Sequence, residues 1–311
     1  MSAIVVSKIF EMLVIFICGF IVYKVHLIDA PAVSKLSNLL LMFISPLLIF
    51  ESYQIDFDKT LLQGLLWSLL GSAICFAAVI FLSEFIFPQK DGHSSIEKMA
   101  TVYSNCGFIG IPLADGVLGA EGVFYATAFN AMFNLMLWTH GVLIMNRACG
   151  RSSRLINPEN LKNLITPPII AIFLGILCFV FQLRLPSLIN EPLDIIGDMN
   201  TPIAMMVAGA NLAQSEFLKS LRNLRIYFVC AVKLLLFPLI SLLILWALPL
   251  SFNVAFTLFL CISCPTGAVS IMFADRYDQD APYASEIFVI STVLCVITIP
   301  LLSFAAENLL R

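Results

Sequence analysis

Two short segments of this 311-residue chain place glycine and proline in the middle of apolar runs. One reads Ser104-Asn-Cys-Gly-Phe-Ile-Gly-Ile-Pro-Leu113 and the other Ser263-Cys-Pro-Thr-Gly-Ala-Val-Ser270. Because glycine and proline disfavour continuous helix, each segment predicts a helix broken in two. A break exposes unpaired backbone N–H groups and a partial positive charge where the second half-helix begins. Two such ends predict a site for a small anion, made of Asn105, Gly107, Gly110 and Pro112 in the first segment and Pro265, Thr266, Gly267 and Ser270 in the second.

In this interpretation, two residues of the site also have helix-end roles. Pro112 suits the first position of a new half-helix, where its missing N–H costs nothing. Ser270 suits the N-cap of the other half-helix. A pair of packing kinks is the structural alternative, since glycine and proline are common in membrane helices.

Several polar side chains in apolar surroundings could add contacts, because such residues are costly inside a membrane. Lys233 could pair with a substrate carboxylate or extend its amine to the interface. Asn130 and Asn134 lie one helical turn apart and could bind substrate or bond to another helix. Asp115 could cap the half-helix or couple transport to protons. For His140 and Glu286 a structural role is favoured.

The composition argues against other kinds of site. The formal charge of −3 gives no basic excess for nucleic acid. The nine cysteines lie mostly inside apolar runs and are interpreted as packing residues, and one Cys261-x-x-Cys264 pair cannot build a tetrahedral metal site. The sequence contains neither HExxH nor GxSxG. We therefore expect no metal, no cofactor and no enzymatic activity, and a membrane-embedded enzyme is the remote alternative.

The elements that must position these residues are membrane helices. Sixty per cent of the chain is hydrophobic and 12% charged, against roughly 25% charged in an average soluble domain. A spanning helix needs about 20 apolar residues. The chain contains ten such stretches, at about 4–25, 31–53, 60–87, 96–118, 121–146, 166–183, 192–214, 224–249, 252–275 and 281–306.

The basic residues orient these spans. Four Lys and Arg lie on the side that holds both termini and twelve on the opposite side, with Lys233 inside a span. Since cytoplasmic loops collect Lys and Arg, both termini are expected outside and the polar 147–165 loop in the cytoplasm. The chain is then a multi-pass protein of the plasma (inner) membrane.

The two halves of the chain match each other at a displacement of 156 to 158 residues. Gly19 falls on Gly175, Ser45-Pro46 on Thr201-Pro202, Cys106 on Cys264, and Tyr125-Ala-Thr on Tyr283-Ala-Ser. This pattern predicts a first five-span repeat over 1–146, the 147–165 loop and a second repeat over 166–311. A repeat with an odd number of crossings must be inverted in the membrane, as in many secondary transporters. The expected fold is all-α, with ten transmembrane helices of which the fourth and ninth are broken and crossed.

The motifs and their order resemble the auxin efflux carrier family, in its short bacterial-type form. Gly110-Ile-Pro-Leu113 is similar to the family's GIPL segment. The run Pro265 to Tyr277 follows its ninth-span pattern, and Lys233 precedes Pro238 by the family's five positions. Two features depart from the PIN-type auxin exporters: Ser270 stands where they have a second proline, and the 147–165 loop replaces their long central loop.

The resemblance implies an elevator mechanism. It implies a scaffold, which we assign to spans 1, 2, 6 and 7, and a mobile transport domain, which we assign to spans 3–5 and 8–10. It also implies small carboxylates such as malate or malonate as substrates. We therefore expect a secondary transporter of a small organic anion that works in the lipid bilayer, and a homodimer is compatible with these features. A sodium- or proton-coupled transporter of the crossed-helix type is the alternative, for which only Asp115 lies near the breaks.

Overall fold

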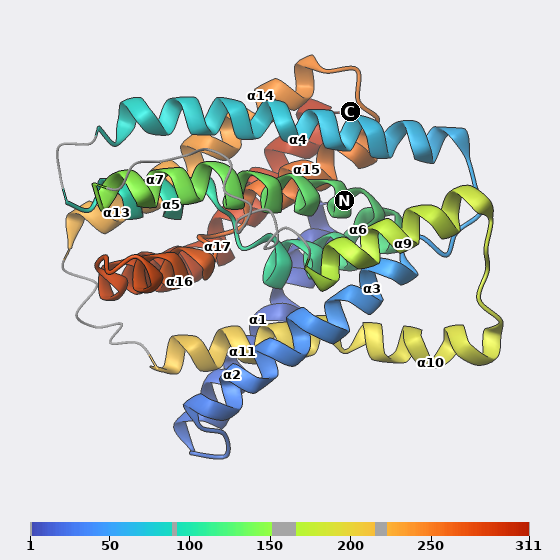
Figure 1. The fold of residues 1–311 in the computed structure, drawn as a ribbon, viewed down its shortest axis with the longest axis horizontal. Helices are drawn as coiled ribbons and strands as arrows, with labels where there is room; N and C mark the ends of the chain where they lie inside the picture. The colour runs from blue at the N-terminus through green and yellow to red at the C-terminus, as the bar shows by residue number, and fades with distance from the viewer. Residues whose placement is uncertain (1, 89–91, 151–165, 215–222, 311) are drawn as a thin grey trace.

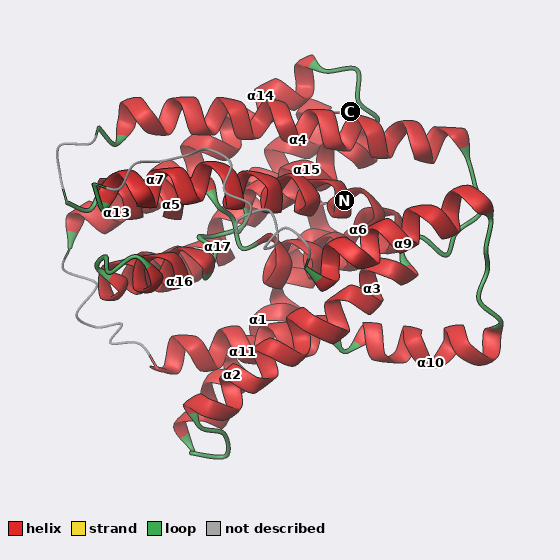
Figure 2. Cartoon of the chain, viewed as in Figure 1, coloured by secondary structure: helices red, strands yellow, loops and turns green. Residues whose placement is uncertain are grey.

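A computed structural model describes residues 2–88, 92–150, 166–214 and 223–310, and within these ranges all regular elements are helices (Figure 1; Figure 2). The first half contains α1 (Ser2–Lys24), α2 (Ala30–Leu39), η1 (Leu40–Ile44), α3 (Ser45–Glu51), α4 (Lys59–Ile86), α5 (Ser94–Val102), η2 (Cys106–Gly110), α6 (Ile111–Met136), η3 (Leu137–Gly141) and α7 (Val142–Ala148). The second half contains α9 (Pro167–Phe181), α10 (Ser187–Asp198), α11 (Asn200–Gln214), α13 (Leu224–Ala231), η4 (Val232–Leu236), α14 (Phe237–Ala247), α15 (Phe252–Ser263), α16 (Val269–Arg276) and α17 (Ala281–Leu310). The predicted all-α class is confirmed.

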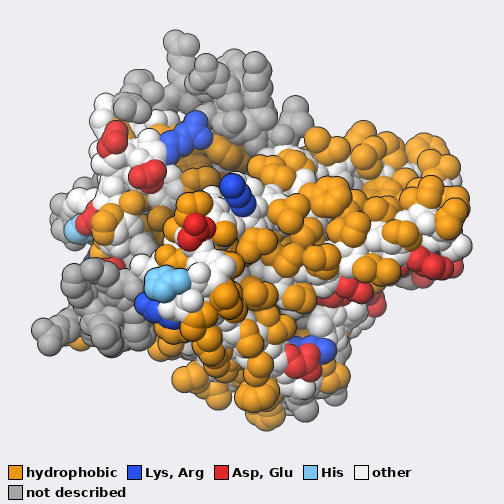
Figure 3. Space-filling model, turned by 90° about the horizontal axis from the view of Figure 1, so that it is seen from below, with side chains coloured by type: hydrophobic (Ala, Val, Ile, Leu, Met, Phe, Trp, Pro, Cys, Tyr) orange, Lys and Arg blue, Asp and Glu red, His pale blue; other side chains and the backbone are white. Residues whose placement is uncertain are grey.

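Six helical stretches among the described residues are long and apolar enough to cross a membrane: Ile4–Lys24, Ala30–Glu51, Lys59–Ile86, Cys106–Ala148, Leu224–Ala247 and Ala281–Leu310. The fourth of these has non-helical backbone at Gly119, which divides it into two arms. Two further apolar helices, α9 and α15, are shorter. Hydrophobic side chains also cover much of the right-hand part of the surface in Figure 3. The chain is therefore a multi-pass membrane protein, while the count of ten spans stays a prediction.

Among the described residues, four wide, π-helical turns lead into α-helices, and three of them precede a proline by two residues. These prolines are Pro46 after η1, Pro112 after η2 and Pro238 after η4. A proline ring clashes with the carbonyl four residues earlier and offers that carbonyl no N–H. In each case the carbonyl four residues before the proline belongs to the wide turn, where the regular hydrogen bond to it is already absent. The helix therefore continues past the proline.

Helices α1 and α11 pack with their backbones in contact. A Cβ atom added at Gly209 would lie 1.9 Å from the Phe16 carbonyl oxygen, and one added at Gly19 would lie 2.2 Å from the Met206 carbonyl oxygen. Small residues at such positions let membrane helices approach closely and gain van der Waals contact. The two helices therefore form a tight pair.

One end of the molecule is joined by charged side chains, beside α5 and α13 in Figure 1. Arg225 donates to both carboxylate oxygens of the buried Glu97 at 2.7 Å, and the Tyr283 hydroxyl donates to the same carboxylate at 2.9 Å. Lys98 pairs with Glu84 at 2.6 Å. These bonds connect α4, α5, α13 and α17 on the side predicted to face the cytoplasm.

Replacing Gly209 with alanine should destabilise the protein, because the new methyl group would overlap the backbone of α1. Overpacking of this kind costs about 1–3 kcal/mol, so the thermal midpoint of the purified protein should fall by several degrees. Gly92→Ala is the matched control, since an added Cβ there meets nothing within 4 Å. An unchanged midpoint for Gly209→Ala would contradict the close packing of α1 and α11.

Candidate binding site

The two predicted interruptions are present. After α5 the backbone is extended at Tyr103 and irregular at Asn105, and helical geometry resumes at Cys106. After α15 the backbone is extended at Cys264, and the next helix begins at Val269. The residue before a proline is driven out of the helical region by the proline ring, which accounts for the extended conformation of Cys264 before Pro265.

The two non-helical segments cross and bond to each other. Ser104 and Thr266 form an isolated antiparallel bridge. The Asn105 N–H donates to the Pro265 carbonyl, and the Gly267 N–H donates to the Tyr103 carbonyl, each at 2.8 Å. Unpaired backbone groups are expensive in a membrane interior. Each segment therefore supplies backbone partners that the other has lost by leaving the helix.

Side chains and a glycine fix the crossing. The Thr266 hydroxyl donates to the Ala100 carbonyl at 2.9 Å, and the Thr266 N–H donates to the Ser291 hydroxyl at 3.2 Å. A Cβ atom at Gly267 would lie 3.1 Å from the carbonyl oxygens of both Tyr103 and Ser104. Glycine is thus what lets the two backbones pass so closely.

Lys233 lies directly beside the crossing. Its side chain is 1% exposed, and its amine donates to the Ser104 hydroxyl at 2.5 Å and to the Ile262 carbonyl at 3.5 Å. The amine does not extend to the interface, so that alternative is wrong. Among the described residues, no carboxylate forms an ion pair with this amine, and its hydrogen-bond partners are neutral.

A cavity of about 380 Å³ opens against the crossing. Asparagines from three parts of the chain line it, together with the first residues of both half-helices and an apolar wall that includes Phe133 and Trp138. None of the described residues that line it carries a formal charge. The asparagines are Asn105, Asn130, Asn134 and Asn211, the residues at the beginning of the half-helices are Cys106, Gly107, Phe108, Ala268 and Val269, and Gly267 of the crossing also lines the cavity.

A second cavity of about 460 Å³ adjoins the first. The two share Asn211, Ala268 and Met272, and the second also reaches Asp275 at the end of α16 and Ser285 near the start of α17. Asp275 and Ser285 lie on either side of the 277–280 connection between α16 and α17. The distribution of Lys and Arg predicts that this connection faces the cytoplasm.

The structure brings most of the predicted site residues together. Asn105, Gly107, Asn130, Asn134 and Gly267 line the cavity, while Pro265, Thr266 and Lys233 belong to the crossing or touch it. Asn134 donates to the Asn130 carbonyl at 2.8 Å, so the bonds between these two asparagines run along one helix. Gly110, Pro112, Ser270 and Asp115 lie outside the cavity lining.

Three of the predicted helix-end roles are wrong. Pro112 does not begin the half-helix, because helical geometry already starts at Cys106 through the wide turn η2. Ser270 is not an N-cap, since Ala268 holds that position and the Ser270 hydroxyl donates to the Gly267 carbonyl at 2.7 Å. Asp115 does not cap the half-helix either, and it lies near the charges of Asp198 and Lys8.

Sequence reasoning missed five polar residues of the cavity lining. Ser104 lies in the first interrupted segment and connects Lys233 to the cavity, and the other four are Ser37, Ser45, Thr166 and Asn211. All five are polar residues within predicted spans, so the cost of burying them was the signal that could have found them.

Comparison with known proteins agrees with a membrane location. The family model described as membrane transport protein matches residues 4–303. An uncharacterized transporter from Methanothermobacter thermautotrophicus is 26% identical over 208 residues. That alignment covers 66% of each chain, which is slightly less than two thirds of the relative's length.

Gly267→Ala should disturb the crossing, because the added methyl group would press on two carbonyl oxygens, one of which accepts the Gly267 N–H. Overpacking at about 1–3 kcal/mol should lower the thermal midpoint by several degrees. Gly107→Ala is the control, since its added Cβ meets nothing within 4 Å although the residue lines the same cavity. Equal midpoints for the two variants would mean that the backbones do not cross closely.

Proposed function

Because the chain belongs to the membrane transport protein family, that of the auxin efflux carriers, we propose that it is a secondary transporter that binds a small organic anion, a carboxylate, where its two interrupted helices cross. The observation that carries this proposal is the buried Lys233 amine, which donates to the cavity-lining Ser104 and whose hydrogen-bond partners among the described residues are all neutral. Charging an amine in an apolar interior is costly unless an anion compensates it. A substrate carboxylate at the crossing would supply that compensation.

The backbone adds to the attraction for an anion. Cys106, Gly107 and Phe108 begin the half-helix that continues into α6, and they line the cavity. The first N–H groups of a helix have no partner within it and carry partial positive charge. The amide groups of Asn105, Asn130 and Asn134 can donate to the same oxygens.

The arrangement of the helices supports alternating access by an elevator-like movement. We assign α1 to α3 and α9 to α11 to the scaffold, whose centre is the tight α1 and α11 pair. We assign α4 to α7 and α13 to α17 to the transport domain, which contains the crossing. The cavity is bounded by Leu41 and Pro167 from the first group and by the crossing from the second. A substrate there would contact both groups.

We also propose that the chain consists of two inverted five-span repeats, 1–146 and 166–311, joined by the 147–165 loop. Of that loop, residues 151–165 lie outside the described residues. If the 147–165 loop is cytoplasmic, the second cavity gives the substrate cavity a route to the cytoplasm, and the conformation is inward-facing.

A cation-coupled transporter is the second candidate, and coupling through Asp115 is its specific form. Asp115 is separated from the cavity lining and lies near Lys8 and Asp198. Transport that depends on an imposed sodium or proton gradient, and that is uncoupled by Asp115→Asn without loss of substrate binding, would favour it.

Lys233→Met should impair carboxylate transport. In proteoliposomes loaded with unlabelled substrate, counterflow of radiolabelled malate, malonate or lactate should be measurable for the wild type, with no uptake of choline. Removing the amine should raise the KM for the transported carboxylate at least about tenfold, which corresponds to about 1.4 kcal/mol of binding.

Lys35→Met is the matched control, because Lys35 is an exposed lysine on α2. Its counterflow should equal that of the wild type. Full activity of Lys233→Met, or wild-type transport of choline in place of carboxylates, would sink the anion proposal.

The predicted orientation has a separate test. A cysteine introduced at Ser152, in the 147–165 loop, should be protected from a membrane-impermeant maleimide in intact cells and labelled after permeabilisation. The mass of the peptide that contains residue 152 reports the modification independently of the nine native cysteines. Labelling of intact cells would reverse the topology.

A further inference from the structure

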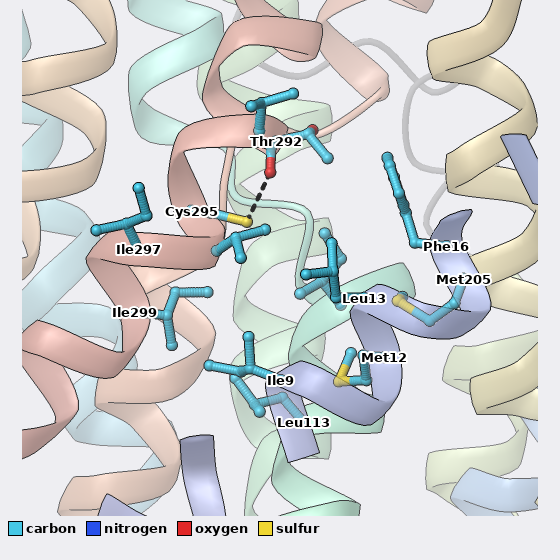
Figure 4. Close-up of a pocket in the computed structure, with 13 residues that line it drawn as sticks. Ile9, Met12, Leu13, Phe16, Leu113, Met205, Thr292, Cys295, Ile297 and Ile299 are labelled. Atoms are coloured by element: carbon cyan, nitrogen blue, oxygen red, sulfur yellow. Dashed lines mark hydrogen bonds between the residues drawn. The ribbon is translucent and has the colours of Figure 1, made fainter. Parts of the chain in front are cut away.

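A third, apolar cavity lies on the other side of the half-helix that begins at Cys106. Its volume is about 240 Å³, and it lies between α1 and α17, with η2, α6 and α11 contributing the remaining walls. Figure 4 shows side chains of α1 and α17 facing each other across it. It is thus distinct from the cavity that Ser104 and the asparagines line.

Water has almost nothing to bind in this cavity. The polar side chains of the lining are Thr292 and Cys295, and both are engaged: the Thr292 hydroxyl donates to the Phe288 carbonyl at 2.7 Å and the Cys295 thiol to the Thr292 carbonyl at 3.0 Å. An engineered protein cavity of about 150 Å³ with aliphatic walls stays dry and accepts benzene. The present cavity offers room for a larger piece of hydrocarbon.

The cavity opens sideways at mid-membrane depth. Its residues on α1 and α17 lie at least about 10 Å from either end of their helices, at 1.5 Å per residue. Ile297 is 62% exposed and Val293 36% exposed at its edge, whereas Leu113 is fully buried at its back wall. Phe10, Val14 and Leu301 are exposed on the same two helices. In a membrane these exposed residues contact acyl chains, so the opening faces hydrocarbon.

We propose that this cavity is a binding site for the acyl chain of a bilayer phospholipid, which enters between α1 and α17 and ends against Leu113 and Met205. The part of the lipid that occupies the cavity is the end of the acyl chain far from the headgroup, because a headgroup at this depth would be separated from water. A lipid chain would restore the packing contacts that an empty space forfeits. It would also fill the gap between the tight α1 and α11 pair and the helices that carry the crossing.

A photoreactive phospholipid tests this. The purified wild-type protein is reconstituted into liposomes that contain phosphatidylcholine with a diazirine near the end of one acyl chain. After irradiation, peptide mass spectrometry should find adducts on the buried Leu113 and Met205 as well as on the exposed Phe10. The same lipid with its diazirine near the glycerol should not label Leu113 or Met205. Adducts on exposed residues alone, or equal labelling by both probes, would overturn the proposal.

Val296→Phe is the matched comparison, because Val296 lines the cavity and the larger side chain of phenylalanine should exclude the acyl chain from it. Adducts on Leu113 and Met205 should fall severalfold while those on Phe10 persist. Leu301→Phe, on an exposed position of the same helix outside the cavity lining, should leave all adducts unchanged. Unchanged labelling of Leu113 and Met205 in Val296→Phe would also overturn the proposal. If that variant does not fold, the two wild-type probes still decide the question.

Discussion

Backbone groups that leave a helix inside a membrane must find new partners, and the centre of this protein is organised by that constraint. The segments after α5 and α15 meet it by bonding to each other, through the Asn105 N–H to Pro265 and the Gly267 N–H to Tyr103. Irregular backbone at membrane depth is tolerated only inside the protein or beside a cavity. Here the irregular backbone lies inside the protein and beside a cavity, and the first residues of both half-helices line that cavity.

The crossing also explains the position of the buried charge. Ser104 takes part in the backbone bridge, and its hydroxyl accepts from Lys233. The amine therefore depends on the crossing for a hydrogen bond, and it lies behind a cavity whose described lining residues are formally neutral. An anion that approaches the asparagines would meet that charge through a single serine side chain. The proposed selectivity for anions thus follows from the same contact that joins the two segments.

Sequence reasoning found the helical class, the family resemblance and both interruptions, because glycine, proline and apolar length act locally. The family resemblance is confirmed, and the backbone leaves helical geometry at Asn105 and at Cys264. The exact helix ends were not predictable in the same way. The wide turn η2 lets Pro112 lie inside a helix, and the N-cap of α16 is Ala268 and not Ser270. Contacts between distant segments, such as Lys233 with Ser104, depend on packing that no local pattern reports.

The most direct test of the central claim is a disulfide across the crossing. Ser104 and Thr266 form a pair of the kind whose Cα atoms lie about 4.5 Å apart, within the range that a disulfide spans. With Cys106, Cys261 and Cys264 replaced by serine, the double variant Ser104→Cys and Thr266→Cys should form an intramolecular disulfide on mild oxidation in membranes. Mass spectrometry should then find the two peptides joined. Two free thiols under the same conditions, in a protein that remains folded, would contradict the crossing on which the account depends.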